Sequence, residues 1–273
     1  MLTSLMKPVL GQEKASSIIN SIIEKTGNPA LKNTVDVFKT GNPSDKVTGI
    51  VTCMFATMDV LQKAVELKCN LIIAHEPLFY NHEDKTIQFT GDQVFEAKKK
   101  FIANNKLIIW RFHDYIHMMK PDGISTGMAK KFGWEPYKVN GEEDHFVIPS
   151  TTLRELIAYL KILFPENTFN VVGDPLLQVS NIRVAAGAPG SGTHFSLLRK
   201  EDTDVVIAGE VPQWETYEYV RDAIQQGRKK AIIFLGHIPS EEAGMEYAAT
   251  WLKGFITGIP VYFIKSGPSY WSY

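Results

Sequence analysis

Three short apolar runs in this chain each lead into histidine, and this pattern constrains the fold more than any other feature. The runs and the polar residues that follow them are 71–74 with His75 and Glu76, 107–110 with His113 and His117, and 231–235 with His237 and Glu241. Short apolar runs of this kind are typical of buried strands in a parallel sheet. Because open α/β proteins hold their ligands beyond the carboxyl ends of the strands, the sequence predicts a metal site there.

Segments with the periodicity of amphipathic helices alternate with the strand-like runs. The expected helices are residues 12–25, 59–67, 92–104, 122–132, 153–160, 214–226 and 241–256. Further strands are expected at residues 34–38, 47–53, 144–148, 169–172, 179–185, 205–208 and 261–264. The alternation predicts mainly parallel sheets in a three-layer αβα arrangement. We expect two similar α/β lobes, residues 1–135 and 136–273, with the metal site between them.

The composition of the 273-residue chain excludes several classes of partner. A formal net charge of -1 argues against a general electrostatic attraction to nucleic acid or to an anionic membrane. The apolar runs fall short of the ~20 residues that span a bilayer, so no membrane segment is expected. The two cysteines, Cys53 and Cys69, cannot form a disulfide framework. A reducing compartment is therefore favoured, which predicts a cytoplasmic protein, or one from which a leader peptide has been removed.

The histidines differ in how strongly they indicate a metal. His75 and Glu76 are adjacent, and Pro77 fixes the turn that follows, so a sharp bend could aim both side chains at one ion. His113 and His117 have the i,i+4 spacing that would place them on one face of a helix. The residues at 121–123 (PDG) instead favour a loop, and the spacing is then only a weak indication.

The segment at residues 236–242 has a structural explanation for part of its sequence. Ser240 is a good N-cap for the following helix, and Glu241 would then sit favourably in the first helical turn. That explanation leaves His237 unaccounted for, on an expected loop between a strand and a helix. A strand-end histidine followed by a helix-start carboxylate could present two ligands to one ion. The remaining histidines stand among ordinary loop or strand residues and are expected to be structural; they are His82, His145 and His194.

Four of these segments, at residues 75–79, 113–117, 208–210 and 237–244, match motifs of one family. The chain resembles the Nif-three-like family of dinuclear metal-centre proteins, also labelled GTP cyclohydrolase type-two homologues. In the family the motifs are His-His-Pro-Leu-Phe, His-Thr-Asn-Leu-Asp, Thr-Gly-Glu and His-x-x-Ser-Glu-x-x-Gly. The resemblance covers nearly the whole chain. It implies one compact unit of this fold without an inserted domain.

The resemblance also implies a set of metal ligands, namely His75, Glu76, His117, His237 and Glu241. Glu76 stands where the family has a histidine, and His117 stands where it has an aspartate. Because these two changes exchange one histidine for one carboxylate, the set keeps three histidines and two carboxylates, which is compatible with a working site. His113 matches a further family histidine and is expected to orient a ligand or move a proton rather than to bind the metal.

Mixed nitrogen and oxygen ligation of this kind suits two divalent ions of zinc, iron or manganese, with Glu241 as the expected bridge. Water bound to such ions is acidified and can act as a nucleophile. Glu210 is expected to accept a proton or to bind substrate. The leading hypothesis is a metal-dependent hydrolase that acts on a small phosphorylated or nucleotide-like substrate.

Other functions are compatible with the same residues. The alternative is a metal-binding regulatory, chaperone or scaffold protein without turnover. A cyclohydrolase activity receives little support, because no segment is typical of a guanine pocket and residues 188–192 lack the Walker pattern of a phosphate-binding loop. The resemblance also implies a homohexamer.

Overall fold

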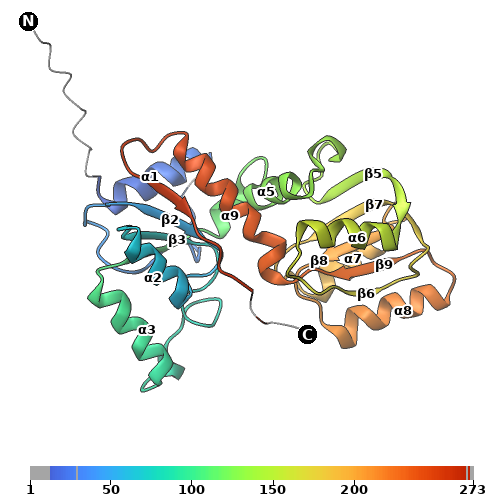
Figure 1. The fold of residues 1–273 in the computed structure, drawn as a ribbon, viewed down its shortest axis with the longest axis horizontal. Helices are drawn as coiled ribbons and strands as arrows, with labels where there is room; N and C mark the ends of the chain where they lie inside the picture. Colours follow the sequence, from blue (N-terminus) through green and yellow to red (C-terminus); the bar gives the residue numbers. More distant parts are fainter. Residues whose placement is uncertain (1–12, 29, 269, 271–273) are drawn as a thin grey trace, which may run out of the picture. The chain divides into compact units, whose positions relative to one another are not determined.

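The structure, a computed structural model, describes residues 13–28, 30–268 and 270. Its contacts divide the chain into two compact units (Figure 1). Unit 1 comprises Met1–Gly123 and Met245–Ser266, and unit 2 comprises Ile124–Gly244 and Gly267–Tyr273. Each unit contains one five-stranded sheet.

The sheet of unit 1 has the order β1-β4-β3-β2-β10, with the four strands from β4 to β10 parallel and β1 antiparallel at one edge. Its strands are β1 (Phe38–Thr40), β2 (Ile50–Cys53), β3 (Leu71–Ala74), β4 (Ile108–Arg111) and β10 (Val261–Phe263). The helical elements are α1 (Ala15–Lys25), α2 (Met58–Glu66), η1 (Ile87–Phe89), α3 (Gln93–Asn104) and α4 (Asp114–Met118). The strands from β2 to β4 are buried along their whole length, which explains their continuous apolar sequences.

Helices cover both faces of this sheet. Apolar side chains of α2 and α3, including Leu61 and Ile102, share one core with Val51 and Ile72 of the strands. Figure 1 shows α1 on the other side of the sheet. The result is the three-layer arrangement predicted from the alternation of strands and helices.

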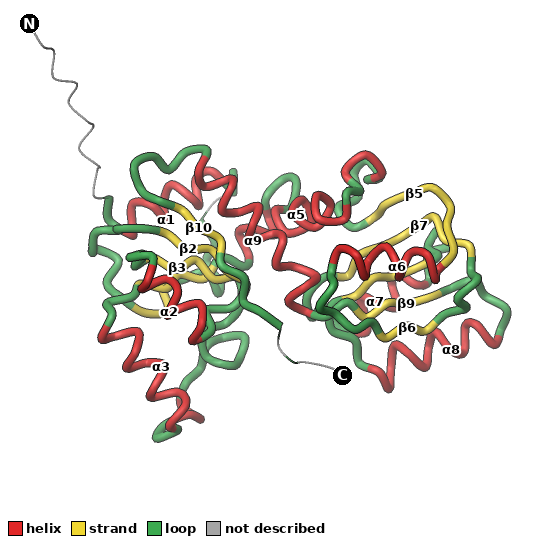
Figure 2. Tube along the Cα trace, in the orientation of Figure 1, coloured by secondary structure: helices red, strands yellow, loops and turns green. Residues whose placement is uncertain are grey.

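The sheet of unit 2 has the order β5-β7-β8-β9-β6, with parallel strands β7, β8 and β9 between two antiparallel edge strands. Its strands are β5 (His145–Thr152), β6 (Asn170–Val172), β7 (Gln178–Ala185), β8 (Val205–Ala208) and β9 (Ala231–Phe234). Its helical elements are α5 (Gly123–Phe132), η2 (Glu135–Tyr137), α6 (Leu153–Leu163), α7 (Ser191–Leu198), η3 (Gln213–Tyr217) and α8 (Glu218–Gln225). Figure 2 shows its strands in yellow between red helices.

Alternate residues of the central strands face two separate cores in unit 2. Val205 and Ile207 of β8 pack in one core with residues of α5 and α6. Val206 and Ala208 pack in the other core with residues of α7 and α8. This alternation is the period-2 geometry of a strand that is buried on both faces.

The last helix, α9 (His237–Lys253), contains the boundary between Gly244 and Met245 that separates the two units. The strand that follows it, β10, pairs with β2 in the sheet of unit 1, although it was expected in the C-terminal lobe. The predicted boundary between two lobes, at residues 135 and 136, remains a prediction. The predicted α/β class with two sheets is confirmed. Within the described ranges, none of the helices combines the length and the apolar character needed to cross a bilayer.

Candidate metal centre

His75 and Glu76 continue the line of β3 beyond its carboxyl end. Their backbone N–H groups donate to the carbonyls of Cys53 (3.1 Å) and Met54 (2.9 Å), which extends the pairing with β2. The His75 ring is fully buried, and its Nδ1 lies 3.0 Å from the carbonyl oxygen of Phe112. Both predicted residues therefore occupy a fixed position at the end of the central strand.

Arg111, the last residue of β4, holds this segment in place. Its Nε donates to the carbonyl of His75 at 3.0 Å, and another guanidinium nitrogen lies 3.4 Å from Oε2 of Glu76. A third contact runs to the carbonyl of His82. Burial lowers the pKa of Arg111, and the negative charge of Glu76 opposes that change. Arg111 was not predicted, because an arginine at the end of an apolar run gives no sign of what it contacts.

His113 and His117 lie at the start and in the body of the short helix α4, so the predicted loop is wrong at this point. The helix forms because Asp36, 77 residues before His113, accepts hydrogen bonds from the backbone N–H groups of His113 (2.7 Å) and Tyr115 (2.8 Å). Burial raises the pKa of Asp36, and these hydrogen bonds oppose that increase. The i,i+4 spacing therefore does place the two histidines on a helix, although the residues that follow them favour a loop.

Each histidine of this group has an oxygen acceptor at Nδ1. Nδ1 of His113 lies 2.9 Å from Asp114, Nδ1 of His117 lies 2.9 Å from Asp122, and His75 has the Phe112 carbonyl. Because a carbonyl or carboxylate only accepts, each Nδ1 carries the hydrogen, and a neutral ring then presents the lone pair of Nε2. Histidines that bind metals are oriented in this way.

The acceptor carboxylate of His113 is itself held in place. Oδ2 of Asp114 accepts hydrogen bonds from Oγ1 of Thr34 (2.7 Å) and from the backbone N–H of Val35 (3.2 Å). Partial burial would raise the pKa of Asp114, but the hydrogen bonds from His113 and Thr34 outweigh it and lower the pKa. The carboxylate therefore stays ionised and keeps the His113 ring in one orientation.

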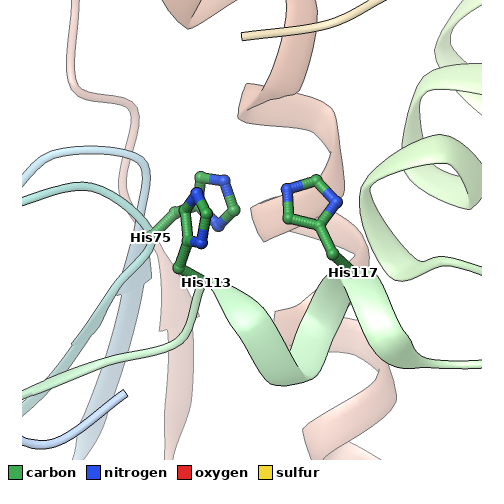
Figure 3. A group of neighbouring side chains, drawn as sticks. All are labelled: His75, His113 and His117. Atoms are coloured by element: carbon green, nitrogen blue, oxygen red, sulfur yellow. The ribbon is translucent and has the colours of Figure 1, made fainter. Parts of the chain in front are cut away.

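The three rings gather around a common space within unit 1 (Figure 3). The ring centroids of His75 and His113 are 4.8 Å apart and the rings are stacked. His117 faces the pair, with its centroid 5.2 Å from each of the other two. One potential ligand atom from each residue lies within 4.8 Å of the others, which is the arrangement of a site that could hold a metal ion.

In unit 2 the expected ligands His237 and Glu241 both lie on α9, four residues apart. Nε2 of His237 and Oε2 of Glu241 are 3.2 Å apart. Nδ1 of His237 lies 2.8 Å from Oε1 of Glu210, so this ring has the same kind of oxygen acceptor as the three in unit 1. The three residues predicted in this half of the chain therefore form one cluster.

The start of α9 differs from the prediction. His237 is its first residue, so it does not lie on a loop, and Ser240 lies within the helix and is not its N-cap. The Ser240 hydroxyl accepts from the backbone N–H of Gly187 (3.0 Å) and donates to the carbonyl of His237 (2.7 Å). The hydroxyl therefore connects the helix start to the end of β7.

Two glycines bring the backbone close to this cluster. A Cβ atom at Gly187 would lie 2.4 Å from Oε1 of Glu241, and one at Gly209 would lie 2.2 Å from the carbonyl oxygen of Gly187. The side chain of Glu241 is 5% exposed. Gly187 is therefore required by its close approach to the carboxylate, and Gly209 by its close approach to the backbone of Gly187.

The groups found in both units fit a divalent metal. Imidazole nitrogens and carboxylate oxygens are the ligands that zinc, iron and manganese take, and every ring has an oxygen acceptor at Nδ1. The rings and Glu241 were predicted from the sequence, but the acceptors of unit 1 were not. The position of Asp114 directly after His113, and of Asp122 five residues after His117, could have indicated two of them. The expected structural role of His194 agrees with its buried position and its Nδ1 contact to Thr216 (3.1 Å).

This is an α/β protein with groups of histidine and carboxylate side chains beyond its strand ends that could hold a divalent metal. The pattern of the Duf34/NIF3 (NGG1p interacting factor 3) family matches residues 15–268. The chain therefore belongs to this family, which confirms the resemblance seen in its motifs.

Known relatives agree with this assignment. A Clostridium acetobutylicum protein named "GTP cyclohydrolase 1 type 2 homolog" is 25% identical over 247 residues, covering 86% of this chain and 88% of the relative. Two solved structures share the fold. Staphylococcus aureus protein SA1388 has a TM-score of 0.73 at 15% identity, covering 96% of this chain and 99% of its own. A Bacillus cereus protein related to NIF3 has a TM-score of 0.72 at 13% identity, covering 95% and 99%.

Proposed function

We propose that the protein is a metal-dependent hydrolase of a small phosphorylated or nucleotide-like substrate. In this proposal two divalent ions of zinc, iron or manganese are held by His75, Glu76, His117, His237 and Glu241. The observation that carries the proposal is the convergence of possible ligand atoms: those of His75, His113 and His117 lie within 4.8 Å of one another, and Nε2 of His237 lies 3.2 Å from Oε2 of Glu241. The oxygen acceptor at Nδ1 of each ring orients it as metal-binding histidines are usually oriented, an arrangement that is not exclusive to them, because His145 and His194 have oxygen contacts at Nδ1 as well.

When bound, such ions acidify water and polarise a phosphoryl oxygen, which is the chemistry of many dinuclear phosphatases and nucleases. The protein's own groups would handle the proton and the orientation. The side chain of Glu210 is 58% exposed, so its carboxylate can reach a substrate or accept a proton while it holds His237. Nε2 of His113, whose ring is fixed by Asp114, is placed beside His75 and His117 and can donate or accept a hydrogen bond there.

The test is turnover by protein that has been stripped with a chelator and reloaded with zinc, iron or manganese. The substrate panel should contain phosphomonoesters and nucleoside triphosphates, with GTP included because the Clostridium acetobutylicum relative has that nucleotide in its name. We expect metal-stimulated hydrolysis that His237→Ala abolishes. Activity that persists in metal-free protein would contradict the proposal. Metal uptake without turnover on any substrate would favour the regulatory, chaperone or scaffold alternative.

The homohexamer implied by the family resemblance is part of this proposal. Its test is light scattering of the purified protein after size-exclusion chromatography, with and without added metal. A mass of six chains is expected, and a monomer at working concentration under both conditions would contradict it.

A further inference from the structure

His113 lies among the histidines of unit 1, but the family pattern places it outside the set of metal ligands. We propose that His113 is itself a metal ligand, and that His75, His113 and His117 bind one divalent ion of the zinc class through their Nε2 atoms. The inference rests on the premise of the proposed function that the protein binds divalent metal. It requires neither a second ion, nor a donor from unit 2, nor turnover.

The position of His113 supports this role. Its ring centroid is as close to those of His75 (4.8 Å) and His117 (5.2 Å) as these two are to each other (5.2 Å). The potential ligand atoms of all three lie within 4.8 Å of one another, and Figure 3 shows the rings around one space. A residue that only oriented another ligand would contact that ligand's far nitrogen. Here Nδ1 of His75 contacts the Phe112 carbonyl and Nδ1 of His117 contacts Asp122, so His113 contacts neither far nitrogen.

The outer contacts of the three rings complete the arrangement. Nδ1 of His113 is directed to Asp114, and that carboxylate is fixed in turn by Thr34 and Val35. A carboxylate or carbonyl at Nδ1, with Nε2 toward the metal, is the usual arrangement around a ligating histidine. All three histidines have it, so His113 does not differ from the two rings already expected to bind metal.

The charge of Glu76 is balanced within the protein by an ion pair, and one of its carboxylate oxygens also lies within 4.8 Å of a ring nitrogen of His75. The buried guanidinium of Arg111 lies 3.4 Å from its carboxylate, and the two side chains are 1% and 10% exposed. A charge pair in such surroundings is costly to disrupt. Compared with the family pattern, unit 1 loses one imidazole because Glu76 replaces a histidine. It regains one because His117 replaces an aspartate, so the number of imidazoles in unit 1 is unchanged.

Three neutral imidazoles define the kind of ion. A site of three histidines with a remaining open position is an established zinc arrangement, and imidazole nitrogen suits zinc better than manganese, magnesium or calcium, which favour oxygen ligands. We therefore expect this site to take zinc or cobalt and to discriminate against manganese and magnesium.

The test uses the full-length chain with His237→Ala and Glu241→Ala combined, which removes the metal donors expected in unit 2. Zinc is measured by elemental analysis after desalting and by competition with a coloured chelator. X-ray absorption of the zinc-loaded protein counts the imidazoles. Into this background His113→Ala and His82→Ala are introduced separately. His82 is the matched control, because its ring is exposed and lies 5.6 Å from that of His113.

We expect one zinc per chain in the background protein, bound by three imidazoles, and unchanged binding in the His82→Ala variant. His113→Ala should weaken zinc binding by more than the 10- to 100-fold typical of a lost outer contact. Thermal unfolding of the metal-free variants shows whether each one is folded. A folded His113→Ala variant whose zinc affinity stays within about 100-fold of the background, or a count of two imidazoles in the background protein, would overturn the inference.

The two proposals fail in different ways. If wild type binds metal but the background protein does not, the unit 1 site is wrong and the proposed function stands. If wild type retains no metal, both fall. Preference for manganese over zinc in the background protein would also contradict the three-histidine site.

Discussion

The short helix α4 carries two candidate metal-binding histidines, and one buried carboxylate holds its start. Asp36 is 5% exposed and accepts hydrogen bonds from the backbone N–H groups of His113 (2.7 Å) and Tyr115 (2.8 Å). Replacing Asp36 with alanine leaves both N–H groups without this acceptor. We expect the loss to destabilise the protein and to weaken metal binding together, because both histidines depend on the same helix.

The expected loss in the free energy of unfolding follows from the two hydrogen bonds. Each bond to a charged acceptor contributes roughly 1.5–3 kcal/mol. The mutation also removes the cost of burying the carboxylate, the cost that raises the pKa of Asp36. The expected net loss for Asp36→Ala is therefore about 2–4 kcal/mol, at or above the largest losses from N-cap deletions. Asp36→Asn keeps one acceptor oxygen and should lose roughly half as much.

The assay is urea denaturation of metal-free protein, followed by zinc competition on the same samples. Asp45→Ala is the matched control, because Asp45 is exposed and its side chain accepts only from Asn42 among the contacts described. A surface change of this kind should shift the free energy of unfolding by less than ~0.5 kcal/mol. If Asp36→Ala is no more destabilising than Asp45→Ala, Asp36 does not hold α4, and the explanation of how α4 forms is refuted.

Two further predictions concern other parts of the fold. Gly187→Ala should displace Glu241 and lower the metal content found by elemental analysis, because the new Cβ would lie 2.4 Å from the carboxylate. Gly190→Ala is the control: Gly190 has a similarly positive φ, but a Cβ there would have nothing within 4 Å, so the metal content should be unchanged. Burial lowers the pKa of Lys98 to about 8, so the folded state binds fewer protons than the unfolded chain above that pH, and stability from this group rises with pH. From pH 7.5 to 9.5 wild type should gain about 2 kcal/mol relative to Lys98→Met in urea denaturation, and an equal pH dependence in both would contradict this. Lys100→Met, at an exposed position, should behave as wild type.

The strand ends were predictable because their signal is local. Continuous apolar runs defined β3 and β9, and the polar residues after them had to lie at the carboxyl edge of a sheet. The i,i+4 pairs of histidine with histidine and of histidine with glutamate were also visible in the sequence. What they could not show was that both pairs are helical, because the contacts that decide it come from distant residues.

The structural features that sequence analysis missed depend on tertiary contacts. The carboxylate of Asp36 starts α4 from 77 residues away, and Arg111 holds its neighbours partly through backbone carbonyls, which have no sequence signal. Ser240 lies within α9, and its hydroxyl accepts a hydrogen bond from the backbone N–H of Gly187. This distant contact explains why Ser240 is not the N-cap that its residue type suggested. The sheet to which β10 belongs was equally hidden, since a three-residue apolar strand pairs wherever an edge is available.

The pairing of β10 with β2 has a consequence for how this chain can be cut. Unit 1 is built from two stretches of sequence, and the second supplies the strand that covers one edge of its sheet. A gene fragment that ended at Gly123 would produce a sheet whose β2 edge is bare, and exposed strand edges promote aggregation. An expression fragment of unit 1 therefore has to carry residues 245–266 joined to it by a linker or a circular permutation. A simple truncation would remove part of the fold along with the second unit.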